Sequence, residues 1–412
     1  MKKMLLLISS LFISISFADE FVEDGTTTIG GYGEMHYDME GNSGDGKLDF
    51  HRFIFYIKHQ FNSEWSMMSE VEVEHNMVGS QAALDGNEGG YLAMEQAHLN
   101  YFNGTWGWKG GVVLQPVGII NEYHEPPTFM SVERPEYNKR IIPTTWFGNG
   151  FAFYGAMGDF NWNVTMTGDL NADEISNGIR SARMKGMGET TEGGWLTTLQ
   201  GSWTGMDGLK VGGSYTMNSP TRSASENQIN CATYDADGDL VINGDALVLG
   251  DCNTAIAEAP LDVTLTEFNA TWSKNNLYAR MEYGMIDYTN NFHQDVADTE
   301  VDANGDPVLD TNGDGSIDDD DATWNPGTIT EIKSSSGYYL DLGYNVGSLL
   351  GWDNELYLWT RTSSYNRDDD GDAHDISLFG VTYKPSNNIS FKVEMGESGG
   401  KDVMRMGLGY MF

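Results

Sequence analysis

Six oxygen-bearing residues in one acidic stretch have the spacing of a calcium-binding loop. Such a loop takes its ligands from positions 1, 3, 5, 7, 9 and 12 and has glycine at position 6, where the chain turns sharply. Gly315 holds that sixth position, and the twelfth is aspartate where glutamate is usual. The expected ligands are Asp310, Asn312, Asp314, Ser316 (through its carbonyl), Asp318 and Asp321. The alternative is a solvated acidic loop, although segment 295–321 has eleven acidic side chains and no basic one.

A second acidic group lies between the two cysteines of the chain. Its members, which repeat part of the same spacing, are Asp235, Asp237, Asp239 and Asn243. We expect calcium there as well, so the predicted cofactor is calcium in a structural role in surface loops. We expect residues 1–18 to be an export signal, so Cys231 and Cys252 are predicted to form a disulfide in an oxidising compartment.

Two rows of charged side chains are predicted to lie side by side on one hairpin. Glu70, Glu72 and Glu74 alternate with valines and therefore share one face of a strand. The preceding strand offers Arg52 and Lys58, and a short turn brings the two rows to cross-strand distance. A transverse electric field that acts on solutes and a ladder of charges that stiffens the wall both fit this pattern. The sequence favours neither.

The remaining polar motifs predict no catalysis. The eight histidines show no spacing typical of a metal site or a catalytic triad. Gly396 to Gly400 matches a nucleophile elbow around Ser398, but that pattern needs a strand–turn–helix context, and here it falls in a hairpin. We therefore expect that the protein is not an enzyme.

The elements that must hold these residues are β-strands. Runs with a period of two recur along the chain, and 50 glycines with 12% aromatic residues are typical of many strands and turns. The sixteen predicted strands span 26–39, 48–61, 65–76, 91–102, 107–115, 149–157, 160–169, 195–204, 208–217, 263–273, 276–287, 337–346, 354–364, 374–383, 388–396 and 402–412.

The lengths of the connections alternate along the chain. Those that follow even-numbered strands are short, whereas those that follow odd-numbered strands include the long segments 116–148, 170–194, 218–262 and 288–336. This alternation of short and long connections is typical of outer-membrane barrels, which have short periplasmic turns and long extracellular loops. We predict an all-β fold, a transmembrane antiparallel β-barrel of about 16 strands, with an aqueous lumen.

The two ends of the chain are also typical of an outer-membrane protein. Residues 1–18 combine two lysines, an apolar stretch and a small-residue cleavage site, which is typical of a signal peptide, and 19–412 remain as the barrel. The alternating apolar residues before Phe412 resemble the closing strand of Gram-negative outer-membrane barrels, which the barrel-assembly machinery reads. The expected surroundings are outer-membrane lipid and lipopolysaccharide of a Gram-negative cell. A net charge of −38 argues against nucleic acid as a partner.

Two stretches resemble one known family. They are Leu48-Asp-Phe-His-Arg-Phe-Ile-Phe-Tyr-Ile-Lys-His-Gln-Phe61 and Gly118-Ile-Ile-Asn-Glu-Tyr-His-Glu-Pro-Pro-Thr-Phe129, the latter continuing through Glu133-Arg-Pro135. Both resemble bacterial porins of the phosphate-selective porin O and P type, most clearly over 30–157. The resemblance implies a homotrimeric 16-stranded channel with one loop folded into the pore. Phosphate selectivity does not carry over. In the family it rests on an eyelet rich in lysine and arginine, whereas this chain is strongly acidic and its bases are scattered.

Segment 116–148 is the candidate constriction loop. It holds five of the ten prolines, and a long connection without periodicity is usually functional or disordered. On the resemblance, the residues near the eyelet would be Glu122, Glu125, Glu133, Arg134, Lys139 and Arg140. The alternative is a loop that covers the barrel mouth or contacts a trimer partner.

The leading hypothesis is a porin for passive diffusion of ions and small hydrophilic solutes. A surface adhesin or receptor anchored by the barrel is the alternative, and the loops 218–262 and 288–336 would permit it. An outer-membrane hydrolase is the weakest alternative, because it needs a Ser/His pair in one wall, which the sequence does not assemble.

Replacing Asp310 and Asp314 with Ala should abolish calcium-dependent protection of 288–336 from protease while leaving the barrel heat-stable. Oxygen ligands favour calcium over zinc, and extracellular modules bind calcium at about 10⁻⁴–10⁻³ M. Limited proteolysis with and without a chelator measures the effect. If chelation leaves cleavage of the wild-type segment unchanged, the segment is a solvated acidic loop.

Overall fold

The structure, a computed structural model, describes most of the chain. The described residues are 25–40, 46–75, 92–172, 175, 178–183, 194–218, 230–232, 242–243, 246–247, 249–251, 260–295, 328–369 and 371–412. Several predicted features lie outside these residues, namely the signal peptide 1–18, the calcium segment 310–321, Asp235, Asp237, Asp239 and Cys252. They remain predictions.

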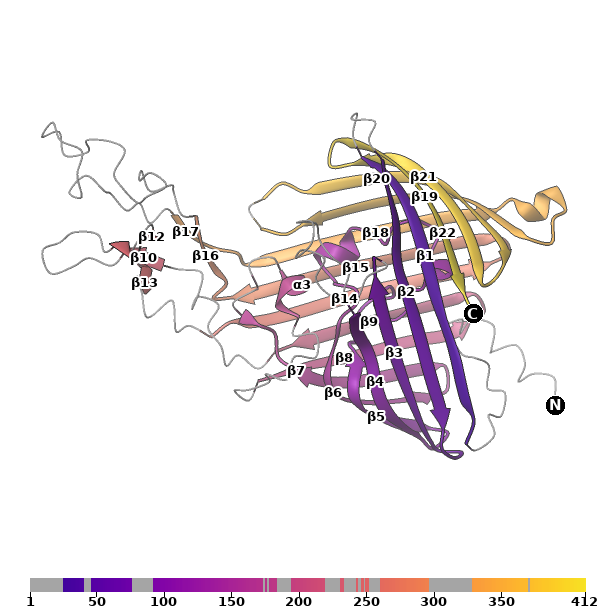
Figure 1. The fold of residues 1–412 in the computed structure, drawn as a ribbon, viewed down its shortest axis with the longest axis horizontal. Helices are drawn as coiled ribbons and strands as arrows, with labels where there is room; N and C mark the ends of the chain where they lie inside the picture. The colour runs from indigo at the N-terminus through magenta and orange to yellow at the C-terminus, as the bar shows by residue number, and fades with distance from the viewer. Residues whose placement is uncertain are drawn as a thin grey trace, which may run out of the picture.

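The described strands close into one antiparallel barrel of sixteen strands, which confirms the predicted fold (Figure 1). The first half comprises β1 (Thr27–Glu40), β2 (Gly46–Gln60), β3 (Trp65–Glu74), β4 (Leu92–Phe102), β5 (Trp106–Leu114), β6 (Phe147–Met157), β7 (Phe160–Gly168) and β8 (Trp195–Met206). The second half comprises β9 (Leu209–Met217), β14 (Asp262–Lys274), β15 (Leu277–Thr289), β18 (Ser334–Asn345), β19 (Glu355–Asn366), β20 (His374–Ser386), β21 (Ile389–Ser398) and β22 (Lys401–Met411). Every boundary lies within three residues of its predicted position.

The last strand closes the barrel against the first. β22 pairs with β1 from Tyr32↔Met411 to Glu40↔Val403. Beyond the ladder, Gly31 and Phe412 exchange two backbone hydrogen bonds of 3.0 and 2.9 Å. Figure 1 shows the two strands side by side, β1 in indigo and β22 in yellow. Closure leaves neither strand with an unpaired edge, which a barrel in lipid requires.

The connections differ in length at the two ends of the barrel, as predicted. At one end the turns are tight, and asparagine shapes them. The Asn62 side chain accepts bonds of 3.0 Å from the amides of Glu64 and Trp65, and Asn103 repeats this arrangement in the next turn at that end. At a third turn, Asn275 and Asn276 take left-handed backbone angles, as a two-residue hairpin requires.

The long connections carry small elements of their own. Outside the barrel sheet lie the paired strands β10 (Asn230–Ala232) and β13 (Leu249–Asp251), β11 (Ile242–Asn243) and β12 (Ala246–Leu247), and β16 (Phe292–Asp295) and β17 (Thr328–Glu331). The long connections also hold the helical elements η2 (Pro126–Thr128), α2 (Tyr137–Arg140) and α3 (Ile179–Ala182), whereas η5 (Gly347–Leu350) lies between β18 and β19 at the other end. No helix in the described part of the chain is long and apolar enough to cross a membrane.

The β10–β13 pair bears on the predicted disulfide. Cys231 pairs with Gly250 in the ladder, and Asn230 pairs with Asp251. The residue before Cys231 therefore lies opposite the residue before Cys252. Cys252 itself lies outside the described residues, so the disulfide stays a prediction.

The two faces of the barrel wall differ in chemistry. On β21, Phe391 and Val393 are exposed on the outer face, whereas the Lys392 and Glu394 side chains between them are buried on the inner face. A charge on a lipid-facing wall costs about 2–4 kcal/mol at mid-depth, and this alternation avoids that cost. Near the tight turns, neighbouring rings form part of an aromatic belt, with Trp65 and Tyr101 at 5.0 Å and Tyr101 and Trp106 at 5.6 Å.

Candidate functional site

Between β5 and β6 the chain turns into the barrel. Residues 115–146 form this segment, here named the inner loop. Asn121 closes its neck. The Asn121 side-chain amide donates to the carbonyls of Gln115 (2.7 Å) and Trp146 (3.1 Å), and its oxygen accepts from the Trp146 amide (2.7 Å). A single asparagine thus holds together the two ends of the inner loop, where the backbone enters and leaves the barrel interior.

An apolar cluster holds one side of the inner loop. Its loop members are Val117, Ile120, Phe129, Tyr137, Ile141, Ile142 and Trp146, each at most 2% exposed. They pack with residues of the β7–β8 connection, including Leu170 and Ile179, and with side chains of β14, β15 and β18. Burying each large side chain contributes about 1.5–3 kcal/mol. The barrel interior therefore contains a real apolar core at this level.

One lysine of the barrel wall holds the proline-rich turn of the inner loop. The Lys392 ammonium on β21 donates to the carbonyls of Pro126 (2.6 Å) and Ser131 (2.7 Å). The same nitrogen lies 3.9 Å from the centre of the Phe129 ring. These contacts with the inner loop place the Lys392 side chain on the lumen side of the wall.

Two further cations act in the same way. Lys384 on β20 donates to the carbonyl of Pro127 (2.7 Å), and Arg280 on β15 donates to the carbonyl of Thr128 (2.9 Å). Consecutive loop carbonyls are therefore held by cations from different strands. Hydrogen bonds to charged groups contribute about 1.5–3 kcal/mol each.

Carboxylates of the wall receive backbone amides of the inner loop. Glu394 on β21 accepts from the Val132 amide (2.7 Å), and Glu282 on β15 accepts from the Ile120 amide (3.2 Å). The Tyr339 hydroxyl also donates to Glu282 (2.6 Å). The wall thus offers donors to loop carbonyls and acceptors to loop amides.

A histidine of the inner loop contacts the opposite part of the wall. The Nε2 atom of His124 lies 3.3 Å from a carboxylate oxygen of Glu95 on β4 and 3.7 Å from one of Glu70 on β3. Burial alone would lower the pKa of His124, but these two carboxylates raise it well above its ordinary value. His124 is therefore a buried imidazolium that anchors the inner loop to β3 and β4.

Glu133 forms a second anchor, on β1. Its carboxylate lies 2.6 Å from Nδ1 of His36 and 3.4 Å from the Lys139 ammonium. Burial would raise the pKa of Glu133, but Lys139 and His36 hold it well below its usual range. The carboxylate stays ionised and ties the inner loop to the first strand.

One tip of the inner loop reaches toward β5 and β9. The Lys210 ammonium on β9 lies 5.1 Å from the centre of the Tyr123 ring. Burial raises the pKa of the neighbouring Glu122, and the charges of Lys210 and of Lys109 on β5 offset this only in part. Glu122 and Tyr123 therefore lie near the bases Lys109 of β5 and Lys210 of β9.

The predicted charge rows lie side by side on β2 and β3. The ladder places Arg52 opposite Glu74 and Tyr56 opposite Glu70. Glu70 accepts from Gln96 (2.6 Å), and Glu72 lies 3.6 Å from Arg52.

Exposure separates the two interpretations of these rows. The carboxylates of Glu70 and Glu72 are 1% exposed, and Arg52, which also bonds to Glu34, is 3% exposed. Within the two rows Arg52 pairs with Glu72, whereas Glu70 contacts Gln96 and His124, and these three charged side chains are shielded from solvent. Lys58 and Glu74 are half-buried.

The other predicted eyelet residues are spread over the inner loop. Glu125 is buried, with the Tyr56 hydroxyl 3.5 Å away, and Arg134 donates to the Thr144 hydroxyl (3.1 Å). Arg140 is 45% exposed and lies 3.6 Å from Glu136. The structure therefore does not gather all six into one ring.

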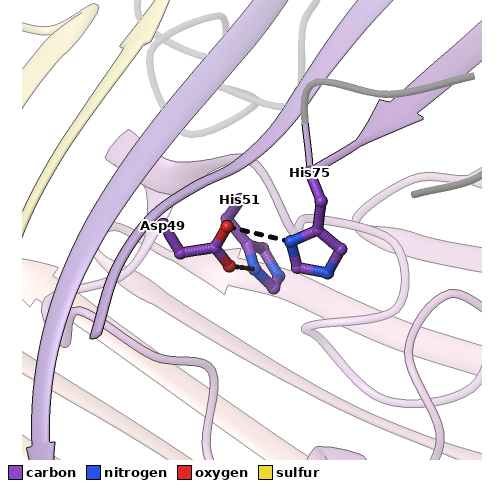
Figure 2. A group of neighbouring side chains, drawn as sticks. All are labelled: Asp49, His51 and His75. Carbon is purple, nitrogen blue, oxygen red and sulfur yellow. Dashed lines mark hydrogen bonds and ion pairs between the residues drawn. The ribbon is translucent and has the colours of Figure 1, made fainter. Parts of the chain in front are cut away.

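Sequence reasoning missed a cluster near the long-connection end of β2 and β3. The carboxylate of Asp49 contacts two imidazoles, with Nδ1 of His75 2.9 Å from one oxygen and Nδ1 of His51 3.3 Å from the other (Figure 2). The spacing of the histidines in the sequence does not indicate this group, because the fold brings His75 to Asp49 and His51 from a different strand. Strict alternation places Asp49 on the outer face, but a shift of register between Glu34 and His36 turns it inward.

A Ser/His contact also exists, although the sequence did not assemble one. Nε2 of His374 lies 3.2 Å from the Ser398 hydroxyl. Ser398 ends β21 in a hairpin, and the His374 ring stacks on Tyr365 at 4.9 Å. Within the described part of the chain, no carboxylate forms a hydrogen bond with this ring. The pair lacks the orienting group that a catalytic histidine uses.

Comparison with known proteins shows the fold. No family model matches the chain. An uncharacterized protein of Aquifex aeolicus (strain VF5) is 41% identical over 149 residues, which is 36% of this chain and 33% of that protein. The match thus spans only a third of the relative's length.

The similar solved structures are outer-membrane barrels. OmpT of Vibrio cholerae with loop L8 deleted superposes with a TM-score of 0.53 at 11% identity, covering 95% of this chain and all of that one. OmpF of Salmonella typhi, solved with daunomycin, gives 0.51 at 11% identity over 94% of this chain and 98% of that one. An anion-selective porin from Comamonas acidovorans gives 0.51 at 9% identity over 94% and 100%. The chain has a porin-type barrel fold.

The Lys392→Met variant should loosen the inner loop without opening the barrel. It removes two charged hydrogen bonds and leaves the carbonyls of Pro126 and Ser131 without their donor. At about 1.5–3 kcal/mol per bond, amide exchange in the inner loop should quicken by at least roughly tenfold. Hydrogen–deuterium exchange with peptide resolution measures this.

The matched control is Lys401→Met, an exposed lysine at the start of β22. It should leave exchange in the inner loop unchanged. Equal exchange in Lys392→Met and wild type would show that Lys392 does not hold the inner loop.

Proposed function

We propose that this protein is an outer-membrane porin, a water-filled channel for passive diffusion of ions and small hydrophilic solutes, with the inner loop as its constriction. The observation that carries the proposal is the anchoring of a proline-rich loop to the inner wall of a closed sixteen-stranded barrel from several sides. A barrel that served only as an anchor has no need of a fixed loop in its lumen.

The inner wall supports passage of polar solutes. On β7, β8 and β14 the inner face carries half-buried amides and a hydroxyl, namely Asn161, Asn163, Gln200, Asn269 and Thr271. Uncharged hydrogen-bonding groups replace part of the hydration of a solute without holding it tightly. With sixteen strands, the barrel is also wide enough for an aqueous channel beside the inner loop.

The outer wall supports a location in the outer membrane of a Gram-negative bacterium. Apolar side chains face outward along the strands, and aromatic rings gather near the tight turns. Contact with lipid and lipopolysaccharide, and assembly through the barrel-assembly machinery at Phe412, belong to the same proposal. So does a homotrimer, which finds support in the trimer form of OmpT from Vibrio cholerae, similar at a TM-score of 0.52.

The phosphate-selective relationship is a separate part of the proposal. It rests on the resemblance of residues 48–61, mostly in β2, and residues 118–129 of the inner loop. Phosphate selectivity itself is not proposed, because the chain is strongly acidic, with 61 acidic against 23 basic side chains. The protein is proposed to have no enzymatic activity. The incomplete Ser398–His374 pair gives the hydrolase alternative no support.

Purified protein in planar lipid bilayers should give discrete conductance steps. If the homotrimer is correct, each insertion should show three equal sublevels. A mock preparation from the same expression strain without the gene controls for contaminating porins. Protein that is folded by heat-modifiable gel migration but gives no steps in several detergents would contradict the channel and favour a surface anchor.

A further inference from the structure

Three residues on the inner face of the barrel bring two imidazoles and one carboxylate together. Asp49 and His51 come from β2, and His75 follows directly after β3. One atom from each residue, an imidazole nitrogen or a carboxylate oxygen, lies within 4.8 Å of the others. Figure 2 shows the Asp49 carboxylate facing both rings, with a dashed line from it to each ring.

Two local departures from regular strand geometry create this arrangement. The register shift between β1 and β2 pairs Glu34 with Arg52 but His36 with Asp49, so β2 has one residue more than β1 in this stretch. Such a bulge re-aims side chains, and bulges recur beside functional sites. Asp49, His51 and Arg52 therefore do not alternate between faces as strand residues normally do.

The second departure is at the end of β3. His75 has a left-handed backbone with φ of 51°, which is uncommon for a residue other than glycine. Its amide donates to the His51 carbonyl (3.1 Å), so His75 lies opposite His51, one step beyond the Arg52–Glu74 pair. Left-handed residues held in this way concentrate at ligand-binding positions.

We propose that Asp49, His51 and His75 bind a divalent first-row transition-metal ion such as Cu²⁺, Ni²⁺ or Zn²⁺. Two imidazoles and a carboxylate are ligands that these metals prefer, whereas Ca²⁺ and Mg²⁺ take oxygen ligands. Metal–nitrogen bonds of about 2.0–2.1 Å place neighbouring ligand atoms of a tetrahedral site roughly 3.3 Å apart. The nitrogen–oxygen separations, 2.9 Å from His75 to one Asp49 oxygen and 3.3 Å from His51 to the other, are close to that spacing.

Access and surroundings favour this cluster over its neighbour. The side chains of His51 and His75 are 28% and 31% exposed, so a hydrated ion reaches them. The adjacent His36 stacks on His51 at 5.1 Å, but Glu133 and Glu34 already pair with both of its ring nitrogens. His36 therefore supports the His51 ring and stays outside the coordination sphere.

Full-length mature protein in detergent tests the proposal with Cu²⁺ and Zn²⁺ as probes. Isothermal titration should show a site that is not displaced by excess Ca²⁺ and that binds Cu²⁺ more tightly than Zn²⁺. Electron paramagnetic resonance of the Cu²⁺ form should show superhyperfine splitting from two imidazole nitrogens. The measurement reads binding alone, so it is independent of whether the protein conducts.

Variants assign the site to these residues. His51→Ala with His75→Ala should lose the two-nitrogen signal, and Asp49→Asn should weaken binding at least tenfold while keeping both imidazoles. The matched control replaces His59 and His374, which lie elsewhere on β2 and β20, with Ala and should bind as wild type does. Folding of each variant is checked by heat-modifiable gel migration.

The contradicting results are equally definite. Wild-type protein without a two-imidazole signal, or an Asp49→Asn variant with wild-type affinity, would overturn the site. The cluster would then be a hydrogen-bonded charge group that closes the end of the β2–β3 hairpin.

Discussion

The fold depends on one electrostatic constraint. The backbone carbonyl and amide groups of a long loop buried inside a barrel need hydrogen-bond partners from the barrel wall. The turn of the inner loop that lies against β20 and β21 is rich in proline, so it has more carbonyl acceptors than amide donors. The inner face of the barrel wall supplies cationic side chains as the donors. Lys392, Lys384 and Arg280 together hold four loop carbonyls. Unpaired carbonyls buried there would each cost about 1–3 kcal/mol.

This constraint explains where the charges of the barrel lie. Lipid excludes them from the outer face, and the inner face near the inner loop needs them for anchoring. Buried charges are stable only when they are paired, and the wall supplies pairs such as Arg361 with Asp341 (2.6 Å) and Arg405 with Glu394 (3.1 Å). Much of the interior charge is therefore structural. We infer that solutes meet mainly the amide and hydroxyl side chains of β7, β8 and β14 and the tip at Glu122.

Sequence periodicity predicted the barrel because alternation is enforced by lipid along every strand. The same alternation puts Arg280 and Lys392 on the strand face opposite the apolar side chains, since a charge is costly in lipid. It could not predict which loop carbonyls these cations hold, because that depends on contacts across 150 residues or more of sequence. Nor could it find the Asp49, His51 and His75 cluster. A bulge adds a single residue and exchanges the two faces of the strand beyond it, and no residue in this stretch marks its position.

The central claim, that the inner loop narrows a conducting lumen, is tested most directly by modifying its tip during current recording. The protein would carry Glu122→Cys, with Cys231 and Cys252 replaced by Ser, and a bulky anionic methanethiosulfonate would be added to open channels. We predict a stepwise fall in current in each modified subunit, whereas Lys401→Cys in the same background should be modified without effect. Unchanged current in protein shown by mass spectrometry to be modified at Cys introduced in place of Glu122 would contradict the account.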